Sequence, residues 1–210
     1  MQETNTFQSS YFSQIANISE YIANDKEVQK AVSLFKELRK NKGKLFIIGS
    51  GGGAGHASHA TCDFRKLCGL EVCCPTDNVS ELTARINDEG WDNSLVGCME
   101  AMRISSKDLL LVFSVGGGDI NHNISVNLVR AIQHAKSLGC KVIGIVGRSE
   151  GYTAQVADAR IIIPVEQKQL LTPITESFQA IIWHYFASHP ELQQNPTKWE
   201  EASHLKNKAL

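Results

Sequence analysis

The chain has 210 residues, of which 42% are hydrophobic and 20% charged, as expected for a globular protein with one sizeable core. A formal net charge of -1 argues against a nucleic-acid-binding surface, which usually makes a domain basic. The first 25 residues contain neither Lys nor Arg and no long apolar run, so the sequence predicts no signal peptide and no membrane span. The six cysteines show no paired C-x-x-C spacing, which favours free thiols in a reducing cytoplasm over a disulfide framework or a zinc knuckle.

Apolar residues recur every three or four positions from Phe7 to Ile22 and again over residues 26–41, which predicts two helices before the first strand. After them, short apolar runs bounded by glycine alternate with helical patterns. This alternation indicates parallel βαβ units with right-handed crossovers. Strands are predicted at 44–49, 70–74, 108–114, 141–147 and 159–165, and helices at 54–68, 79–102 with a break near 87–92, 123–138, 151–157 and 171–188.

These elements predict a three-layer α/β/α sandwich around a five-stranded parallel sheet. No linker divides the chain, so residues 1–190 are expected to form a single domain. Its N-terminal helices, about residues 5–41, are too apolar for a solvated arm, and packing against another subunit or against their own domain is open. Residues 191–210 are polar and broken by prolines, and we expect an exposed tail without chemistry.

A glycine-rich loop follows the first predicted strand, within FIIGSGGGAGHASHATCDF (residues 46–64). Ser50, Gly51, Gly52 and Gly53 open the next helix, and bare N–H groups at a helix N-terminus suit an anion. Tight strand–helix packing is the alternative reason for such glycines. A nucleotide cofactor is not expected, because no Lys-Ser/Thr pair completes a P-loop and no acidic residue ends the second strand.

A second loop of the same kind follows the third predicted strand, with Ser114, Gly116 and Gly117, and Ser125 at the start of the next helix. The carboxyl ends of parallel strands share one edge of a sheet, so the two loops should meet there. Hydroxyls and bare N–H groups without a lysine suit a sugar phosphate better than a triphosphate.

Asp119 and His122 lie within this second loop. They could contact a substrate or cap the following helix. An acidic or amide side chain before an apolar run is an ordinary helix start, so we expect Asp119 or Asn123 to cap it.

The segments GSGGGAGHASHATCD, TDNVSELTARIND, FSVGGGDINHNISVNLVRA and VIGIVGRSEGYTAQVAD resemble the sugar isomerase (SIS) domain family, and within it the phosphoheptose isomerases. The resemblance covers nearly the whole chain. It implies a flavodoxin-like SIS fold and a homotetramer with active sites near subunit interfaces. It also implies conversion of sedoheptulose 7-phosphate to D-glycero-D-manno-heptose 7-phosphate through an enediol. Asp88, in the Asn-Asp pair that ends the second segment, is then expected to bind substrate.

His56, His59 and Asp63 follow one another at spacings of three and four, so they share one face of the helix after the first loop. Such a face could hold a divalent metal or supply the acid and base of an isomerisation. A solvated polar face is the plain alternative. The resemblance places a metal-binding histidine at His59 and a carboxylate at Asp63.

The resemblance also implies a Gln and a His eight residues apart on the last helix, and two alignments are open here. One places Thr175 and Trp183 at these positions, whereas a shift of one residue places Glu176 and His184 there. The predicted catalytic residues are Asp63, Glu176 and His184, and the predicted ligands of a zinc ion are His59, Asp63, Glu176 and His184.

The altered last helix also permits a non-catalytic SIS protein that senses a sugar phosphate or binds a replication initiator. Both functions use the phosphate loops, so the loops do not discriminate between them. The geometry of the acid and base groups does.

Overall fold

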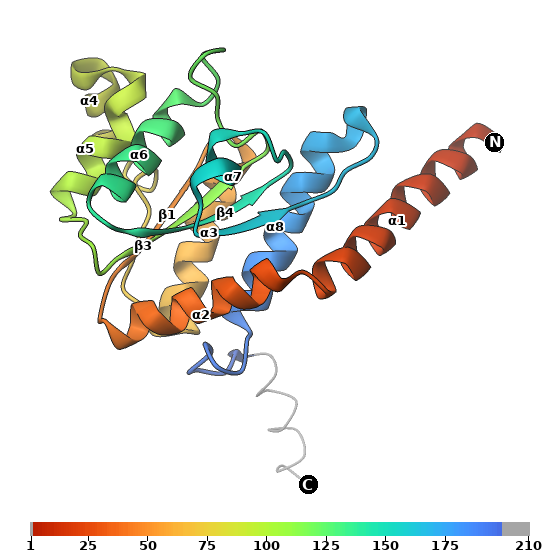
Figure 1. Cartoon of the computed structure of the whole chain (residues 1–210), viewed down its shortest axis with the longest axis horizontal. Helices are drawn as coiled ribbons and strands as arrows, with labels where there is room; N and C mark the ends of the chain where they lie inside the picture. Colours follow the sequence, from red (N-terminus) through yellow and green to blue (C-terminus); the bar gives the residue numbers. More distant parts are fainter. Residues whose placement is uncertain (1, 199–210) are drawn as a thin grey trace, which may run out of the picture.

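The computed structural model describes residues 2–198, and side chains from residue 6 onward. Five parallel strands form one sheet in the order β2-β1-β3-β4-β5 (Figure 1). The elements are α1 (Gln2–Ala23), α2 (Lys26–Lys40), β1 (Leu45–Gly49), α3 (Gly52–Lys66), β2 (Val72–Cys73), α4 (Val79–Glu89), the 3-10 helix η1 (Trp91–Asn93), α5 (Ser94–Ala101), β3 (Leu109–Ser114), α6 (Val126–Ser137), β4 (Lys141–Val146), α7 (Tyr152–Val156), β5 (Ala159–Ile162), the 3-10 helix η2 (Lys168–Leu170) and α8 (Leu171–Ala187).

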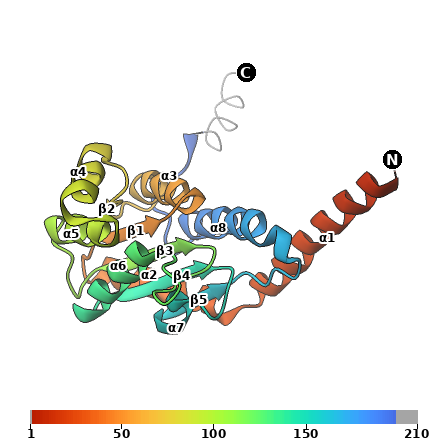
Figure 2. The same cartoon turned by 90° about the horizontal axis from the view of Figure 1, so that it is seen from above.

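Successive residues of the buried strands point to opposite faces of the sheet, and they pack into two separate hydrophobic cores. Leu45 and Ile47 of β1 pack in the core beneath α2, α3 and α8, whereas Phe46 and Ile48 pack in the core beneath α5 and α6. The sheet is therefore covered by helices on both faces (Figure 2). The predicted α/β/α fold class is confirmed.

The first helix, α1, leaves the body of the domain and extends beyond the sheet in both views (Figures 1 and 2). Its second half is anchored, because Gln14 and Ile18 are buried. Towards its start, Phe7 and Phe12 are 59% and 61% exposed. One part of the extension therefore packs on its own domain, as one of the two expectations had it, and the other part presents aromatic rings to the outside.

The segment after α8 folds back onto the domain before the described part of the chain ends. Leu192 is 1% exposed, and its carbonyl oxygen accepts a hydrogen bond of 2.6 Å from Arg39. The backbone N–H groups of Gln194 and Asn195 donate to the carbonyl of Leu67. The expected tail from residue 191 therefore starts with a packed segment, and its residues 199–210 lie outside the described residues.

The helical pattern over 79–102 breaks as predicted, at Gly90, whose φ of +81° suits glycine. The edge strand β2 pairs with β1 over Val72 and Cys73. Pro75, two residues later, has no N–H to continue the ladder.

Among helices of residues 2–198, none combines the length and hydropathy needed to cross a bilayer.

Candidate active site

The two glycine-rich loops lie at the same edge of the sheet, because β1 and β3 are neighbours with Gly49 paired to Phe113. Close packing requires two of the glycines: a Cβ at Gly49 would overlap the backbone of Gly53, and a Cβ at Gly53 would lie 2.7 Å from the Phe113 carbonyl oxygen. Gly51, with a φ of +59°, faces open space. The first loop thus brings α3 against the sheet and leaves its own outer surface free.

The second loop is stabilised by a hydrogen bond between two of its own residues, Ser114 and Gly117. Ser114 is 8% exposed, and its Oγ accepts a hydrogen bond of 3.0 Å from the Gly117 N–H. Thr153 Oγ1 donates to the Gly117 carbonyl at 2.7 Å, and a Cβ at Gly117 would lie 3.1 Å from Gly151. Ser125 has a φ of +48° where α6 begins, and it makes no capping hydrogen bond from its side chain. Its hydroxyl is thus not used to cap α6.

Residues 119–124 form a small hairpin above this loop, closed by an antiparallel bridge between Asp119 and Ile124. The Asp119 carboxylate accepts hydrogen bonds from the N–H groups of Asn121 and His122 and lies 2.6 Å from the His122 ring nitrogen Nδ1. The prediction that Asp119 or Asn123 caps α6 is wrong, because Ser125 holds that position. The carboxylate stabilises the hairpin instead, which a linear pattern does not reveal.

A cluster of metal-binding side chains forms where α3 packs against α8. His59, Asp63 and His184 each offer one ligand atom, and these atoms lie within 4.8 Å of one another. His59 Nε2 is 3.9 Å from an oxygen of Asp63. Two imidazoles and one carboxylate are a donor set that suits zinc, so these residues fit the expected metal.

The orientation of His184 is fixed by a neighbour on its own helix. Its Nδ1 lies 2.8 Å from the carbonyl oxygen of Ala180. A carbonyl only accepts, so Nδ1 donates this hydrogen bond and Nε2 is the ring nitrogen that points away from it. This second contact is the arrangement that usually orients a metal-ligating histidine.

The packing of α8 decides between the two alignments of the last helix. Thr175 and Trp183 are fully buried, so they belong to the core, whereas Glu176 is half-buried and His184 is exposed. Trp183 stacks on His184 with ring centroids 3.4 Å apart, and its ring centroid is 4.8 Å from that of His59. Trp183 reaches α3 as part of the core, whereas the ionisable side chains of α8 that lie near α3 are those of the shifted alignment, Glu176 and His184.

Glu176 lies closer to the glycine loops than the metal cluster does. A Cβ at Gly52 would overlap the Glu176 carboxylate, so this group rests on the first turn of α3. Burial lowers the pKa of His56 below its ordinary value, although the charge of Glu176 opposes this. The sequence predicted His56 on the same candidate face of α3 as His59 and Asp63, but not among the catalytic residues or zinc ligands.

Within one chain, Asp88 lies apart from the side chains that α3 and α8 bring together. It lies exposed near the end of α4, where its carboxylate accepts a hydrogen bond from the Asn87 amide. α4 packs on η1 and α5, and its Leu82 contacts the core on the α5 and α6 face of the sheet.

The sequence profile of the SIS domain family matches residues 10–147, and the chain belongs to this family. The phosphoheptose isomerase of Aliarcobacter butzleri is 32% identical over 142 residues, which are 65% of this chain and 71% of that protein. The phosphoheptose isomerase of Syntrophotalea carbinolica is 27% identical over 185 residues, which are 84% and 88% of the two chains.

Solved structures agree with the fold. The phosphoheptose isomerase GmhA from Neisseria gonorrhoeae superposes with a TM-score of 0.74 at 21% identity, over 88% of this chain and 96% of that one. A phosphoheptose isomerase from Francisella tularensis superposes with a TM-score of 0.73 at 22% identity, over 89% and 97% of the chains.

Proposed function

We propose that the protein is an aldose–ketose isomerase that converts sedoheptulose 7-phosphate to D-glycero-D-manno-heptose 7-phosphate. The names of its relatives support this substrate. The observation that carries the chemistry is the cluster of His59, Asp63 and His184 between α3 and α8, together with the Glu176 carboxylate on the first turn of α3, beside the first glycine loop. An isomerase of this kind needs a base, an acid and a group that stabilises the oxyanion of the enediol.

The phosphate is proposed to bind between the two loops. The free outer surface of Gly51 and the hydroxyl of Ser50 would hold it from one side, with the first-turn N–H groups of Gly52 and Gly53. The second loop, with Ser114, Gly116, Gly117 and Ser125, would hold it from the other side. No nucleotide cofactor is needed for this reaction.

His59, Asp63 and His184 are the proposed zinc ligands. A zinc ion there would act as a Lewis acid on the sugar oxygens. With Asp63 committed to the metal, Glu176 is the carboxylate left free to remove the proton from C1 and return it to C2. Asp63 and His184 are the base and acid of the alternative in which the reaction proceeds without metal.

The protein is proposed to work as a cytoplasmic homotetramer without a nucleic-acid or membrane partner. The exposed Phe7 and Phe12 of α1 support association, because exposed aromatic side chains are usually covered. At the other end of α1, a groove of about 340 Å³ adds an apolar surface, lined by residues that include Ile22, Val28, Ile181 and Tyr185. Asp88 would then contact substrate from a neighbouring subunit.

The decisive experiment is incubation of the purified protein with sedoheptulose 7-phosphate in deuterated water, with and without added zinc. We expect deuterium to enter at C1 and the aldose product to form. Other ketose phosphates, tested in parallel, would establish the preferred sugar.

A non-catalytic SIS regulator is the competing function, suggested by the departures in the last helix, such as Trp183. A protein of that kind would bind sugar phosphates without exchanging the C1 proton. Absence of exchange with every ketose phosphate, with and without metal, would therefore refute the isomerase function.

A further inference from the structure

His56 is the member of the α3 face that neither the proposed metal cluster nor the phosphate loops use. Gly52, His56, His59 and Asp63 are spaced by four, three and four residues, so they form one row along the helix. In this row, His56 lies between the glycine loop and the zinc ligands. A sugar chain that runs from phosphate to metal would pass over it.

Glu176 is the partner that α8 brings to this part of the row. Its carboxylate lies where a Cβ of Gly52 would be, one helical turn before His56 on the same face. Glu176 is also the residue that most favours the charged form of His56, while His59 and His184 act against that form. Both residues therefore lie at the N-terminal end of α3, close enough for the charge of Glu176 to act on the imidazole.

The burial of His56 favours the neutral form of its imidazole. The residue is half-buried, and its ring meets that of Phe113 edge-on, with centroids 6.2 Å apart. Burial lowers its pKa, as stated above. A neutral imidazole near a helix N-terminus can polarise a carbonyl group and pass a hydroxyl proton without carrying a net charge.

We propose that His56 is a further catalytic residue, which hydrogen-bonds to O1 and O2 of the sugar while Glu176 moves the carbon-bound proton. This inference rests on the proposed isomerase function. Glu176 takes the proton from C1, and the electron pair forms the C1–C2 double bond as the carbonyl oxygen O2 gains the charge.

The remaining protons balance within the sugar. The imidazole gives its proton to O2 and receives the proton of O1, and the Glu176 carboxyl group returns a proton to C2. One C–H bond is broken and one is formed, so the aldose results without an oxidant or reductant.

The test replaces His56 with Gln, which keeps a hydrogen-bonding amide but cannot exchange a proton. We expect kcat to fall about 100-fold, in the usual range for a lost general acid–base group. KM should stay within about twofold, and the zinc content should equal that of the parent, since the ligands and phosphate loops are intact. His134→Gln on α6, on the opposite face of the sheet, is the matched control and should keep the parent kcat.

The double variant His56→Gln/Glu176→Gln adds a second measurement. If the two residues act as a unit, it should be about as slow as the slower single variant, because their effects are then far from additive. Parent kcat in His56→Gln, or strictly multiplicative losses in the double variant, would overturn the proposal while leaving the isomerase function intact. An inactive parent protein would instead overturn the isomerase function, and this proposal with it.

Discussion

Gly52 matters because it has no side chain: a Cβ at this position would overlap the Glu176 carboxylate. It occupies the first position of α3 with ordinary helical geometry, so its backbone does not require glycine. What requires glycine is the Glu176 carboxylate from α8, which fills the space of a Cβ. The position of the Glu176 carboxylate therefore depends on the lack of a Cβ at Gly52.

Gly52→Ala should separate stability from activity. Ala favours a helix over Gly by up to about 1 kcal/mol, so the free energy of unfolding should stay equal or rise. The displaced Glu176 carboxylate should lower kcat by about 100-fold, since a shift near 1 Å can have such an effect. Denaturant unfolding and the isomerase assay measure the two quantities.

Gly55→Ala is the matched control, because a Cβ there meets nothing within 4 Å. It should give the same gain in helix stability with the parent kcat. Equal activity of the two variants would contradict the placement of Glu176 against the first turn of α3.

The candidate site could be predicted in part from the sequence. Spacing alone aligned His59 with Asp63 on one helical face, and the structure places them together with His184. The choice between Trp183 and His184 could not be made from the chain, because it depends on which residue the core accepts. Likewise, the contact of Glu176 with Gly52 joins two elements more than 120 residues apart in sequence.

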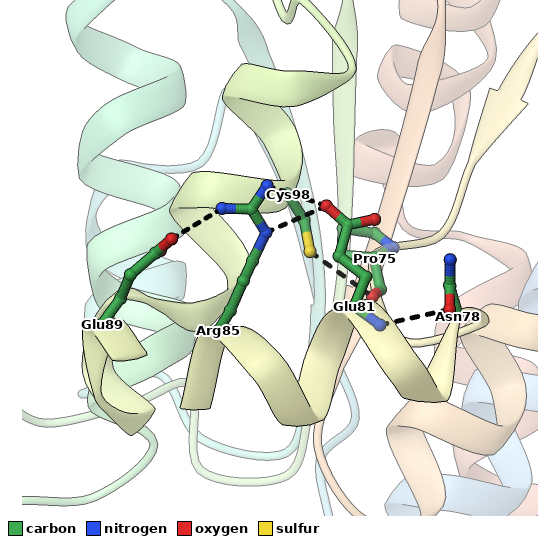
Figure 3. Close-up of polar contacts among 6 residues, drawn as sticks. All are labelled: Pro75, Asn78, Glu81, Arg85, Glu89 and Cys98. Atoms are coloured by element: carbon green, nitrogen blue, oxygen red, sulfur yellow. Dashed lines mark hydrogen bonds and ion pairs between the residues drawn. The ribbon is translucent and has the colours of Figure 1, made fainter. Parts of the chain in front are cut away.

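At the scale of elements, α4 is stabilised by ion pairs within the helix and has no fully buried residue. Every residue of this helix keeps at least partial exposure. Figure 3 shows the Arg85 guanidinium between Glu81 and Glu89, at 2.8 and 2.9 Å from their oxygens. A Cβ at Gly97 of α5 would overlap the guanidinium, so this glycine lets the three charged groups lie against α5.

Arg85→Ala should therefore loosen α4 more than the rest of the domain. We expect faster amide hydrogen exchange over residues 79–89, and a decrease of about 1 kcal/mol in the free energy of unfolding, as for partly exposed helical ion pairs. Arg130→Ala, whose side chain has a single 3.4 Å contact with Gln133, is the control. Unchanged exchange in α4 would mean that the ion pairs do not hold it.

Asp158, the residue before β5, links α6 and β4. Its carboxylate accepts hydrogen bonds from Lys136 of α6 and from Lys141 and the Val142 N–H of β4. Burial alone would raise the pKa of Asp158, but these bonds outweigh it and hold the pKa below the ordinary value.

The stability of Asp158→Asn relative to the parent should accordingly depend on pH. A carboxyl group whose folded-state pKa is depressed stabilises the fold above its unfolded-state pKa, and this contribution is lost as the pH falls through the folded-state pKa. We expect a loss of about 2 kcal/mol at pH 7, and a smaller difference in acid below about pH 4. Urea unfolding across this range measures it, and a difference independent of pH would contradict the ionic role.

At the scale of the whole molecule, the order of elements was accessible from the sequence. The strands β1, β3 and β4 are short apolar runs, and α6 after β3 has a buried apolar face, so local patterns and fold agree there. The hairpin at 119–124 was not accessible, because it depends on side-chain contacts of Asp119 rather than on periodicity. The direction in which α1 leaves the domain could not be predicted either, because an apolar stripe does not identify the surface that it packs against.

The tetramer proposed above can be tested at α1. Phe7→Ser combined with Phe12→Ser should shift the protein to smaller species in light scattering, because two largely exposed rings would no longer be available for burial. Gln8→Ser on the same helix is the control. A monomeric parent protein, or an unchanged mass in the double variant, would contradict association through this helix.

Trp183 gives the molecule a built-in optical sensor. Its indole is closed off from solvent, yet it lies flat on one proposed zinc ligand and edge-on to another. Its emission should respond to occupancy of those imidazoles, and a Trp91→Phe/Trp199→Phe background would remove the other two indoles of the chain. Loading of the groove could thus be followed by fluorescence, without any label, before a turnover assay exists.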